Sequence, residues 1–303
     1  MTQLTAVGEA LDFVERHLKE EIAVADMADA AGYSLYHFCR VFNGLVHHTP
    51  YDYLMRRRLS QSARSLLETN WQIIDIAFEY QFNSHETYSR AFKRMFGVPP
   101  SHYRARHSDP NAPPDQRLWM PRLSLAYLCH INQGAGPKPT LIEKDALHLA
   151  GLMSLIEDKD AATIPELWQL LAQELIHLED DEASYEHYGV AWHPSAARRG
   201  TCFYLAAIEA PFPADRGHSS LVVKTLPPLT YARFRHRGPR SALDLTRGYI
   251  YHTWLPQSNA ALAYPSEIEI ECHGRTVPTS AHEAGSWEIL IPIQSPRPAS
   301  IPQ

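Results

Sequence analysis

The sequence predicts a multidomain protein, in which an all-α domain with two helix-turn-helix units joined by a long helix precedes an α+β domain. The 303 residues are roughly twice the length of a typical single domain. From Leu4 to Arg106 apolar residues recur at helical intervals. Beyond Leu118 short apolar or alternating runs are separated by Pro and Gly, which favours strands. The predicted boundaries are residues 1–107 for the first domain, 108–120 for a Pro-rich linker and 121–303 for the second domain.

Two segments of the helical domain, Val24–Phe42 and Ile74–Phe92, share one pattern. Each begins with a short helix of small apolar residues, which allows a second helix to cross it closely. Ala28 and Ala77 lie at the predicted crossings. The shared pattern therefore predicts two helix-turn-helix units.

The second helix of each unit starts after a serine, Ser34 or Ser84, whose side chain can accept a hydrogen bond from a free backbone N–H. Its inner face is aromatic. Its outer face offers side chains that can reach base edges and phosphates in a major groove of DNA. The candidate DNA-binding residues are Tyr36, His37, Cys39 and Arg40 in the first unit and His85, Glu86, Thr87, Ser89, Arg90 and Lys93 in the second.

Between the two units, residues 51–69 are strongly periodic and predict a long helix. Its apolar stripe contains Tyr51, Met55, Leu59, Ala63 and Leu66, with Arg56, Arg57 and Arg58 off that stripe. At 1.5 Å per residue the helix is roughly 25 to 30 Å long. That length suits two recognition helices separated by about one turn of B-DNA, roughly 34 Å.

The net charge of −6 argues against a protein that coats DNA without sequence preference. The cations are nevertheless concentrated in the helical domain: Arg40, Arg56, Arg57, Arg58, Arg64, Arg90, Lys93, Arg94, Arg104 and Arg106. A local basic face is therefore compatible with an acidic protein, since phosphates respond to the local field.

The second domain alternates strands with two helices. The predicted strands are Leu123–Ile131, Leu147–Leu155, Thr201–Ile208, Leu221–Thr225, Thr230–His236, Glu267–Cys272 and Trp287–Ile293, and the predicted helices are Ile164–Leu178 and Ala242–Trp254. This order predicts an α+β domain in which a strand-helix-strand arrangement is used twice.

Five large aromatic residues of this domain are candidates for a ligand site: Trp168, Tyr204, Tyr251, Trp254 and Trp287. Glu267, Glu269 and Glu271 fall on one face of a strand because their spacing is two. A carboxylate among aromatic rings attracts an organic cation. The alternative is that these glutamates are solvated on an edge strand.

Several classes of site are not expected. Residues 1–9 lack the basic start and apolar core of an export signal, and no stretch approaches the roughly 20 apolar residues of a membrane span, so a cytoplasmic protein without membrane contact is predicted. The four cysteines lie far apart in the sequence, which favours reduced thiols over a disulfide framework: Cys39, Cys129, Cys202 and Cys272. His130, His148, His236, His252 and His273 lack ligand spacing, so no metal and no cofactor is expected.

The helical domain resembles the DNA-binding domain of the AraC/XylS family. The motifs are Ala31-Gly-Tyr-Ser, Phe38-Cys-Arg-Val-Phe42, Tyr53-Leu-Met-Arg-Arg-Arg-Leu59, Ile76-Ala77 and the run from Ala91 to Arg104. The resemblance implies that Tyr36, Cys39, Arg40, His85, Glu86, Ser89 and Arg90 occupy base-facing positions. It also implies double-stranded DNA and RNA polymerase as partners.

Two residues depart from the family pattern. Gln81 stands where the family usually has a turn glycine, so the second turn is expected to be strained or its helix to be angled differently. Cys39 replaces a position often filled by longer polar side chains, which predicts weaker base discrimination in the first unit.

The second domain is similar, from about Lys138 to Ile293, to the GyrI-like (SOUL-type) small-molecule-binding domain, which is joined to an AraC-like domain in the Rob subgroup. The resemblance implies a pseudo-twofold fold with a ligand cleft between its halves. It further implies a buried glutamate on the strand at 267–272, for which Glu269 is the best match and Glu271 the next.

The sequence thus predicts a sequence-specific DNA-binding transcription regulator, not an enzyme, whose activity responds to a small-molecule effector. The expected effector is a cationic or amphiphilic aromatic compound. Two alternatives concern the second domain: a hydrolase that uses a cleft glutamate as general base, and a protein-interaction module. A third is a helical bundle without a DNA role. The interpretation requires both recognition helices to face outward from one long helix.

Overall fold

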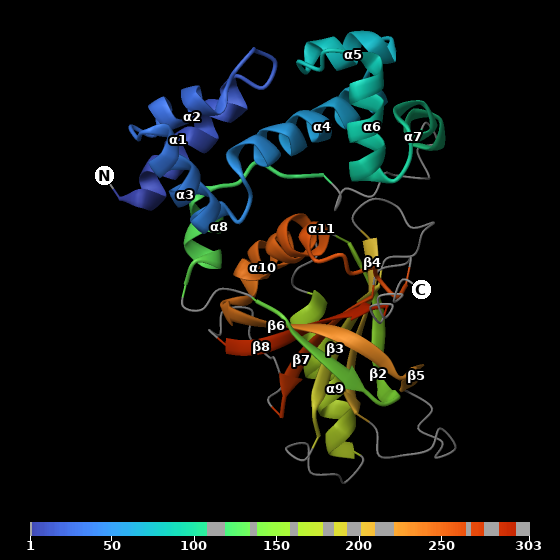
Figure 1. The fold of residues 1–303 in the computed structure, drawn as a ribbon. Helices are drawn as coiled ribbons and strands as arrows, with labels where there is room; N and C mark the ends of the chain where they lie inside the picture. The colour runs from blue at the N-terminus through green and yellow to red at the C-terminus, as the bar shows by residue number, and fades with distance from the viewer. Residues whose placement is uncertain are drawn as a thin grey trace, which may run out of the picture. The chain divides into compact units, whose positions relative to one another are not determined.

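The computed structural model describes residues 2–107, 119–133, 138–157, 163–177, 185–192, 201–209, 221–264, 268–275 and 285–294 (Figure 1). The chain forms two compact units. The first comprises Met1–Gly136 and Leu245–Gln257, and the second Pro137–Asp244 and Ser258–Gln303. Residues 108–118 of the predicted linker lie outside the described residues. The functional boundaries drawn from the sequence stay a prediction.

The first unit is helical in all of its described elements. These are α1 (Gln3–Arg16), α2 (Val24–Ala30), α3 (Leu35–Val46), α4 (Pro50–Glu68), α5 (Ile73–Glu79), α6 (His85–Phe96), α7 (Pro100–His107) and α8 (Leu125–Ile131), with most of α10 (Leu243–Tyr249), a π-helical turn (Ile250–Trp254) and α11 (Leu255–Gln257). In Figure 1 the long helix α4 runs between α1–α3 and α5–α7. The predicted pair of helix-turn-helix units joined by a long helix is confirmed.

The recognition helices begin where the sequence places them. Ser34 and Ser84 are the capping residues of α3 and α6, and Ala28 and Ala77 are buried in the helices that precede them. The Ser84 side chain accepts a hydrogen bond from the Thr87 N–H at 3.1 Å, as expected. The Ser34 hydroxyl makes no such bond, so α3 starts without its side-chain cap.

Both helix-turn-helix turns use a left-handed residue. Gly32 has a φ of +69° and Gln81 a φ of +63°. The following residues close the same bond, from the Tyr33 N–H to Ala28 O and from the Phe82 N–H to Ala77 O. The predicted strain at Gln81 is therefore present as a positive φ in a residue with a Cβ. Its amide donates to Lys19 O at 2.6 Å, which helps hold this turn.

Two arginines of α4 are structural, which corrects the expectation that they contribute to a basic face. Arg57 forms a two-pronged ion pair with Glu15, with N–O distances of 2.6 and 2.7 Å. Burial lowers the pKa of Arg57, but the Glu15 hydrogen bond and charge raise it overall. Arg58 donates to Leu18 O at 3.0 Å and to Glu20 O at 2.6 Å. Both side chains tie α4 to α1 and the residues after it.

The predicted strand at Leu123–Ile131 is wrong, because these residues contain helix α8. The Ser124 hydroxyl accepts from the Tyr127 N–H at 3.1 Å and starts the helix. The buried residues Tyr127, Leu128 and Ile131 form its apolar side. A short apolar run of this kind fits a strand or a helix by pattern alone.

The residues before α8 are also attached to the helical unit. The Met120 N–H donates to Ser60 Oγ of α4 at 2.8 Å, and Met120 O accepts from Arg57. Trp119 Nε1 donates to the Tyr103 hydroxyl at 2.8 Å. The last two residues of the predicted linker, Trp119 and Met120, therefore pack against α7 and α4.

The second unit contains one antiparallel sheet with the strand order β1-β6-β8-β7-β3-β4-β2-β5. The elements are β1 (Thr140–Lys144), β2 (Leu147–Glu157), α9 (Thr163–His177), β3 (His187–Trp192), β4 (Thr201–Glu209), β5 (Val222–Leu226), β6 (Leu229–Gly238), β7 (Ile268–Gly274) and β8 (Gly285–Ile293). The remaining six predicted strands and the helix at Ile164–Leu178 are confirmed within a few residues. β1 and β3 were not predicted.

The predicted twofold repetition appears in the connectivity. The order β1, β2, α9, β3, β4 is followed by β5, β6, α10, β7, β8. The first strand of each set is exchanged, since β1 pairs with β6 and β5 pairs with β2. The two sets meet where β3 pairs with β7 at the centre of the sheet.

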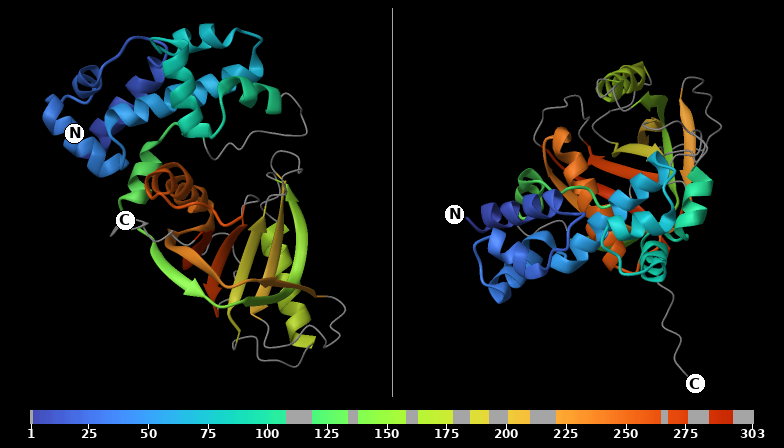
Figure 2. Two further views of the ribbon diagram at one scale, coloured as in Figure 1. Left: turned by 45° about the vertical axis from the view of Figure 1, so that its right-hand side comes forward. Right: turned by 90° about the horizontal axis from the view of Figure 1, so that it is seen from above.

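The sheet has two different apolar faces. Helix α9 packs on β2 and β4 (Figure 2). Its side chains Trp168 and Leu171 are buried there. The opposite face buries Tyr188, Val190 and Ile270. Because side chains alternate along a strand, Gly189, Ala191, Glu269 and Glu271 share the α9 side.

Candidate DNA interface and ligand site

Helix α3 separates an aromatic inner face from a polar outer face. Phe38 and Phe42 are fully buried, whereas the Tyr36 side chain is 81% exposed. Arg40 is also exposed, and His37 and Cys39 are half-buried. All four residues predicted for DNA binding on this helix therefore have solvent access, and their roles stay a prediction.

Helix α6 repeats the arrangement with a more polar surface. Tyr88, Phe92 and Phe96 face the core. The predicted DNA-binding residues of this helix have solvent access: His85, Glu86, Thr87, Arg90 and Lys93 are exposed and Ser89 is half-buried. An acid in the first turn and cations in the last turn also match the helix dipole.

The two recognition helices flank opposite ends of α4 (Figure 1). The 19 residues of α4 give a length of about 28 Å at 1.5 Å per residue. This is close to the roughly 34 Å between successive major grooves on one face of B-DNA. The helical unit can thus present two reading helices at groove spacing within one polypeptide.

The exposed cations of the helical unit are fewer than the sequence suggested. Arg57 and Arg58 are buried, and Arg104 donates to Leu66 O and Trp71 O. The exposed members of the predicted cationic set are Arg40, Arg64, Arg90, Lys93, Arg94 and Arg106. Several of these lie on the recognition helices, where they can reach phosphates or bases.

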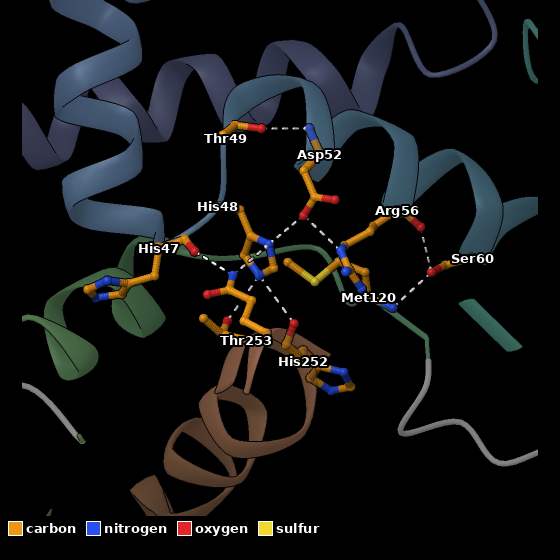
Figure 3. Close-up of polar contacts among 10 residues, drawn as sticks. His47, His48, Thr49, Asp52, Arg56, Ser60, Met120, His252 and Thr253 are labelled. Atoms are coloured by element: carbon orange, nitrogen blue, oxygen red, sulfur yellow. Dashed lines mark hydrogen bonds and ion pairs between the residues drawn. The ribbon is translucent and has the colours of Figure 1, made fainter. Parts of the chain in front are cut away.

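A polar cluster links the start of α4 to the segment 245–257 (Figure 3). His48 Nδ1 lies 2.7 Å from Asp52 Oδ2, and Arg56 Nε donates to the same oxygen at 2.8 Å. Burial raises the pKa of Asp52, but the His48 hydrogen bond and the Arg56 charge outweigh this effect and lower the pKa to about 2. On its other side His48 Nε2 lies 3.2 Å from Thr253 Oγ1.

A cavity of about 410 Å³ lies beside this cluster. Its lining includes Arg56 of α4, Arg94 of α6 and Tyr251 of the π-helical turn. Tyr251 and Trp254, both predicted for the ligand site, thus belong to the first unit. Their part in ligand binding stays a prediction.

The carboxylates of β7 are buried, which overturns the alternative of solvated glutamates on an edge strand. Glu269 is 7% exposed and Glu271 is 1% exposed. β7 pairs with β8 on one side and β3 on the other, so it is an internal strand. Glu267 lies outside the described residues.

Glu271 is the centre of a hydrogen-bond network. The Tyr204 hydroxyl donates to Glu271 Oε2 at 2.9 Å, and the Arg240 guanidinium donates to its two oxygens at 2.8 and 3.1 Å. His273 Nε2 lies 3.2 Å from the same Oε2. Burial lowers the pKa of Arg240, but the charge of Glu271 raises it overall. Arg240 is therefore held as a cation against a buried carboxylate.

Aromatic rings surround this network. The Trp168 ring lies 5.5 Å from that of His273, and Trp287 lies 5.7 Å from His273 and 4.5 Å from His236. Trp168 Nε1 donates to the Tyr204 hydroxyl at 3.3 Å. Three predicted ligand residues, Trp168, Tyr204 and Trp287, are thus gathered around Glu271. Such a wall of rings beside a carboxylate can hold an organic cation.

Trp287 leaves a buried donor unused. Its side chain is 9% exposed, and its Nε1 has no hydrogen-bond partner among the described residues. A buried N–H without a partner is uncommon and costs free energy. A bound molecule with an acceptor atom would satisfy it.

Sequence reasoning missed three residues of this cluster as members of the site: Arg240, His273 and Gly189. A Cβ at Gly189 would lie 2.1 Å from the Tyr204 hydroxyl oxygen and 3.0 Å from Glu271 Oε2. The glycine therefore makes room for the Tyr204–Glu271 bond. A glycine inside a strand is a signal of such close approach, although β3 itself was not predicted.

Two kinds of site are absent from the described residues. They contain no cluster of three or more His, Cys, Asp or Glu side chains placed to hold a metal ion. No helix in the described part of the chain has both the length and the apolar composition to cross a membrane.

These features define a chain that combines paired helix-turn-helix units with a sheet domain built around a buried carboxylate. Residues 27–106 match the helix-turn-helix domain family, and residues 137–294 match the GyrI-like small molecule binding domain family. The chain belongs to the GyrI-like family, with an AraC-type helix-turn-helix domain ahead of the GyrI-like domain. The resemblance noted in the sequence is confirmed.

Curated relatives match the helical domain. Over 99 residues the chain is 40% identical to the uncharacterized HTH-type transcriptional regulator YbfP of Bacillus subtilis (strain 168), covering 33% of this chain and 34% of YbfP. It is 37% identical to the HTH-type transcriptional activator AarP of Providencia stuartii, covering 34% and 76%. It is 38% identical to the Right origin-binding protein of Escherichia coli (strain K12), covering 34% and 36%. The match thus spans about a third of the length of YbfP and of the Right origin-binding protein.

Proposed function

We propose that this protein is a sequence-specific DNA-binding transcription regulator whose DNA affinity is altered by a small molecule bound at the Glu271 network. The main support is that α3 and α6 flank one helix, α4, and that each turns a polar face to solvent over an aromatic core. The names of its relatives, which include transcriptional regulators and an activator, agree with this role.

The solvent-facing residues of α3 and α6 differ in the kind of DNA contact that each can make. Arg40 and Arg90 are exposed on the recognition helices and can form paired hydrogen bonds to a guanine edge. Lys93 is a single-point cation in the last turn of α6 and suits a phosphate contact. The half-buried Cys39 offers only a weak donor, so α3 relies on its neighbours for base reading.

The effector acts by shifting the equilibrium between two arrangements of the chain that differ in DNA affinity. A ligand that binds two arrangements of the chain equally well changes nothing, so it must prefer the arrangement with higher or lower DNA affinity. The aromatic rings around Glu271 select a molecule with a flat or branched apolar body. RNA polymerase is the proposed protein partner, and the cytoplasm is the proposed location.

Binding rather than turnover is the proposed role of Glu271. A general base needs a carboxylate oxygen directed at the proton it removes. Both oxygens of Glu271 instead accept from Arg240, and Oε2 also accepts from Tyr204. Glu271 is therefore held as an ionised, fully hydrogen-bonded carboxylate with neither oxygen directed at a substrate proton, which disfavours the hydrolase alternative.

A DNA titration tests the proposal. A binding site is selected from random duplexes with the full chain, and affinity is measured by fluorescence anisotropy across a salt series. We expect affinity to fall steeply with salt. Arg40→Ala and Arg90→Ala should each weaken binding by about 1 to 3 kcal/mol and relax base preference. Arg235→Ala, at an exposed arginine of β6, is the matched control and should have no effect.

A spacing test addresses the two-groove geometry. Inserting about five base pairs between the two contacted segments rotates one groove by half a helical turn. Binding by both α3 and α6 predicts a loss of affinity similar to that of the variants. Equal affinity for the selected and scrambled duplexes at every salt concentration would refute sequence-specific binding.

A further inference from the structure

Arg240 is the arginine whose guanidinium contacts the buried carboxylate of Glu271. It begins the short 3₁₀ turn Arg240–Ala242 after β6 and reaches across to β7. Its guanidinium contacts both oxygens of Glu271 at 2.8 and 3.1 Å. The ring of Tyr204 lies 5.8 Å from the guanidinium carbon, within the range of a cation–π contact.

The carboxylate and its cation differ in their access to water. The side chain of Glu271 is 1% exposed, whereas that of Arg240 is 16% exposed. A buried, ionised carboxylate without a cation is strongly unfavourable, so Glu271 is most stable as a carboxylate while a positive partner contacts it. Arg240 has a route to solvent, and Glu271 has almost none.

We propose that Arg240 is a built-in counter-ion, and that an organic cation binds Glu271 only in exchange for the Arg240 guanidinium. The proposal rests on the proposed function, in which the Glu271 network is the ligand site, and adds the role of Arg240 at that site. In the exchange one positive charge replaces another on Glu271, and the released guanidinium regains its hydration. The number of ion pairs in the buried network is unchanged, so affinity depends on how well the ligand competes with Arg240.

The remaining contacts favour exchange over loss of the network. The Tyr204 hydroxyl donates to Glu271 at 2.9 Å, while its contact with Arg240 is longer, at 3.4 Å. Tyr204 can therefore stay on Glu271 when Arg240 leaves. The buried rings of Trp168 and Trp287 border the network, and Trp287 Nε1, which has no partner among the described residues, can donate to an acceptor atom of the ligand.

The exchange sets a minimum strength with which a cation must bind Glu271 in order to displace Arg240. A weakly held cation cannot displace a guanidinium that makes two charge-assisted hydrogen bonds. A cation with a large aromatic body can contact the Trp168 and Trp287 rings in addition to Tyr204, the ring within cation–π range of Arg240. Arg240 thereby sets which cations the protein detects.

Calorimetry on the full chain tests the exchange. The probes are tetraphenylphosphonium, an aromatic cation, and triphenylphosphine oxide, a neutral molecule of similar shape. We expect R240Q to bind the phosphonium at least about tenfold more tightly than the native chain and the oxide within about twofold of it. R237Q, which changes an exposed arginine at the end of β6, should match the native chain for both probes. R240Q/E271Q should lose the gain.

Several outcomes would overturn the exchange. Unchanged or weaker phosphonium binding by folded R240Q would do so, and equal gains for both probes would show an enlarged space instead of charge competition. Absence of phosphonium binding by every variant would reject the cation class. If R240Q melts early, R240K is the substitute, since lysine makes fewer bonds to a carboxylate and should give a smaller gain of the same sign. DNA affinity, measured on the same preparations, reports separately on the regulator role.

Discussion

His48 Nε2 and Thr253 Oγ1 lie 3.2 Å apart, so the segment just before α4 contacts the π-helical turn Ile250–Trp254 (Figure 3). The contact is supported by Gln257, whose amide donates to His47 O at 2.6 Å. The same stretch of chain begins at Arg240, on the Glu271 network. Residues 240–253 of the chain, followed by the hydrogen bond from Thr253 to His48, thus connect Arg240 to the helix that joins the recognition helices.

Removing the Thr253 hydroxyl should weaken this route. We expect Thr253→Val, which preserves side-chain shape, to reduce the effect of tetraphenylphosphonium on DNA affinity by several-fold while leaving phosphonium binding itself unchanged. Anisotropy with and without saturating phosphonium measures the effect. Thr140→Val, on the exposed edge strand β1, is the control. A full effector response in Thr253→Val would mean that coupling does not pass through this contact.

The pH dependence of stability should report the Asp52 cluster. The pKa of Asp52 is lowered to about 2 in the folded chain, against about 3.9 for an unperturbed aspartate. Its stabilisation is therefore complete above about pH 4 and is lost as the pH falls toward 2. Because Asp52 is 39% exposed, Asp52→Asn should cost no more than about 1 kcal/mol at neutral pH.

Urea denaturation at several pH values measures that difference. The gap between native chain and Asp52→Asn should close on acidification. A gap that stays constant from pH 6 to pH 2 would show that the Asp52 charge contributes nothing to folding.

The two helix-turn-helix turns should respond differently to substitution. Gly32→Ala places a Cβ at a φ of +69° and should cost about 1 to 2 kcal/mol. Gln81→Gly relieves a similar backbone strain. It also raises the conformational entropy of the unfolded chain and removes the hydrogen bond to Lys19 O, and both of these effects destabilise the fold. These terms nearly cancel, so its stability should lie within about 0.5 kcal/mol of the native value. Chemical denaturation compares both, and equal losses in the two variants would contradict the strain at Gln81.

Local patterns were sufficient to predict most of the helical unit. Serine caps, small residues at the crossings and aromatic inner faces are spaced within a few turns, so α3 and α6 could be located from sequence. The helix α8 was mistaken for a strand because its apolar run is too short to show a period. β1 was missed as a short edge strand, and β3 because Gly189 interrupts it.

Partners that are distant in sequence could not be predicted. The burial of Arg57 depends on Glu15, and the pairing of Arg240 with Glu271 depends on the fold of the whole sheet. Periodicity gives the face of an element but not what covers it. For that reason Glu269 and Glu271 were recognised as sharing a face, while the cation beside Glu271 was not.

Gly189 should be intolerant of a side chain. In Gly189→Ala the new Cβ would lie 2.1 Å from the Tyr204 hydroxyl oxygen, so the overpacked site should lose about 1 to 3 kcal/mol of stability. Phosphonium binding should weaken with it. Gly8→Ala, in α1, meets no atom within 4 Å and should stabilise the chain by up to about 1 kcal/mol. Thermal unfolding and calorimetry measure both, and a neutral Gly189→Ala would contradict the close packing.

The attachment of Trp119 and Met120 to the helical unit bears on how the protein survives proteolysis. Trp119 is hydrogen-bonded to Tyr103 of α7, and Met120 is hydrogen-bonded to Ser60 and Arg57 of α4. Cleavage between residues 108 and 118 would therefore nick the backbone without releasing either piece. The two fragments should elute together in gel filtration and separate only in denaturant.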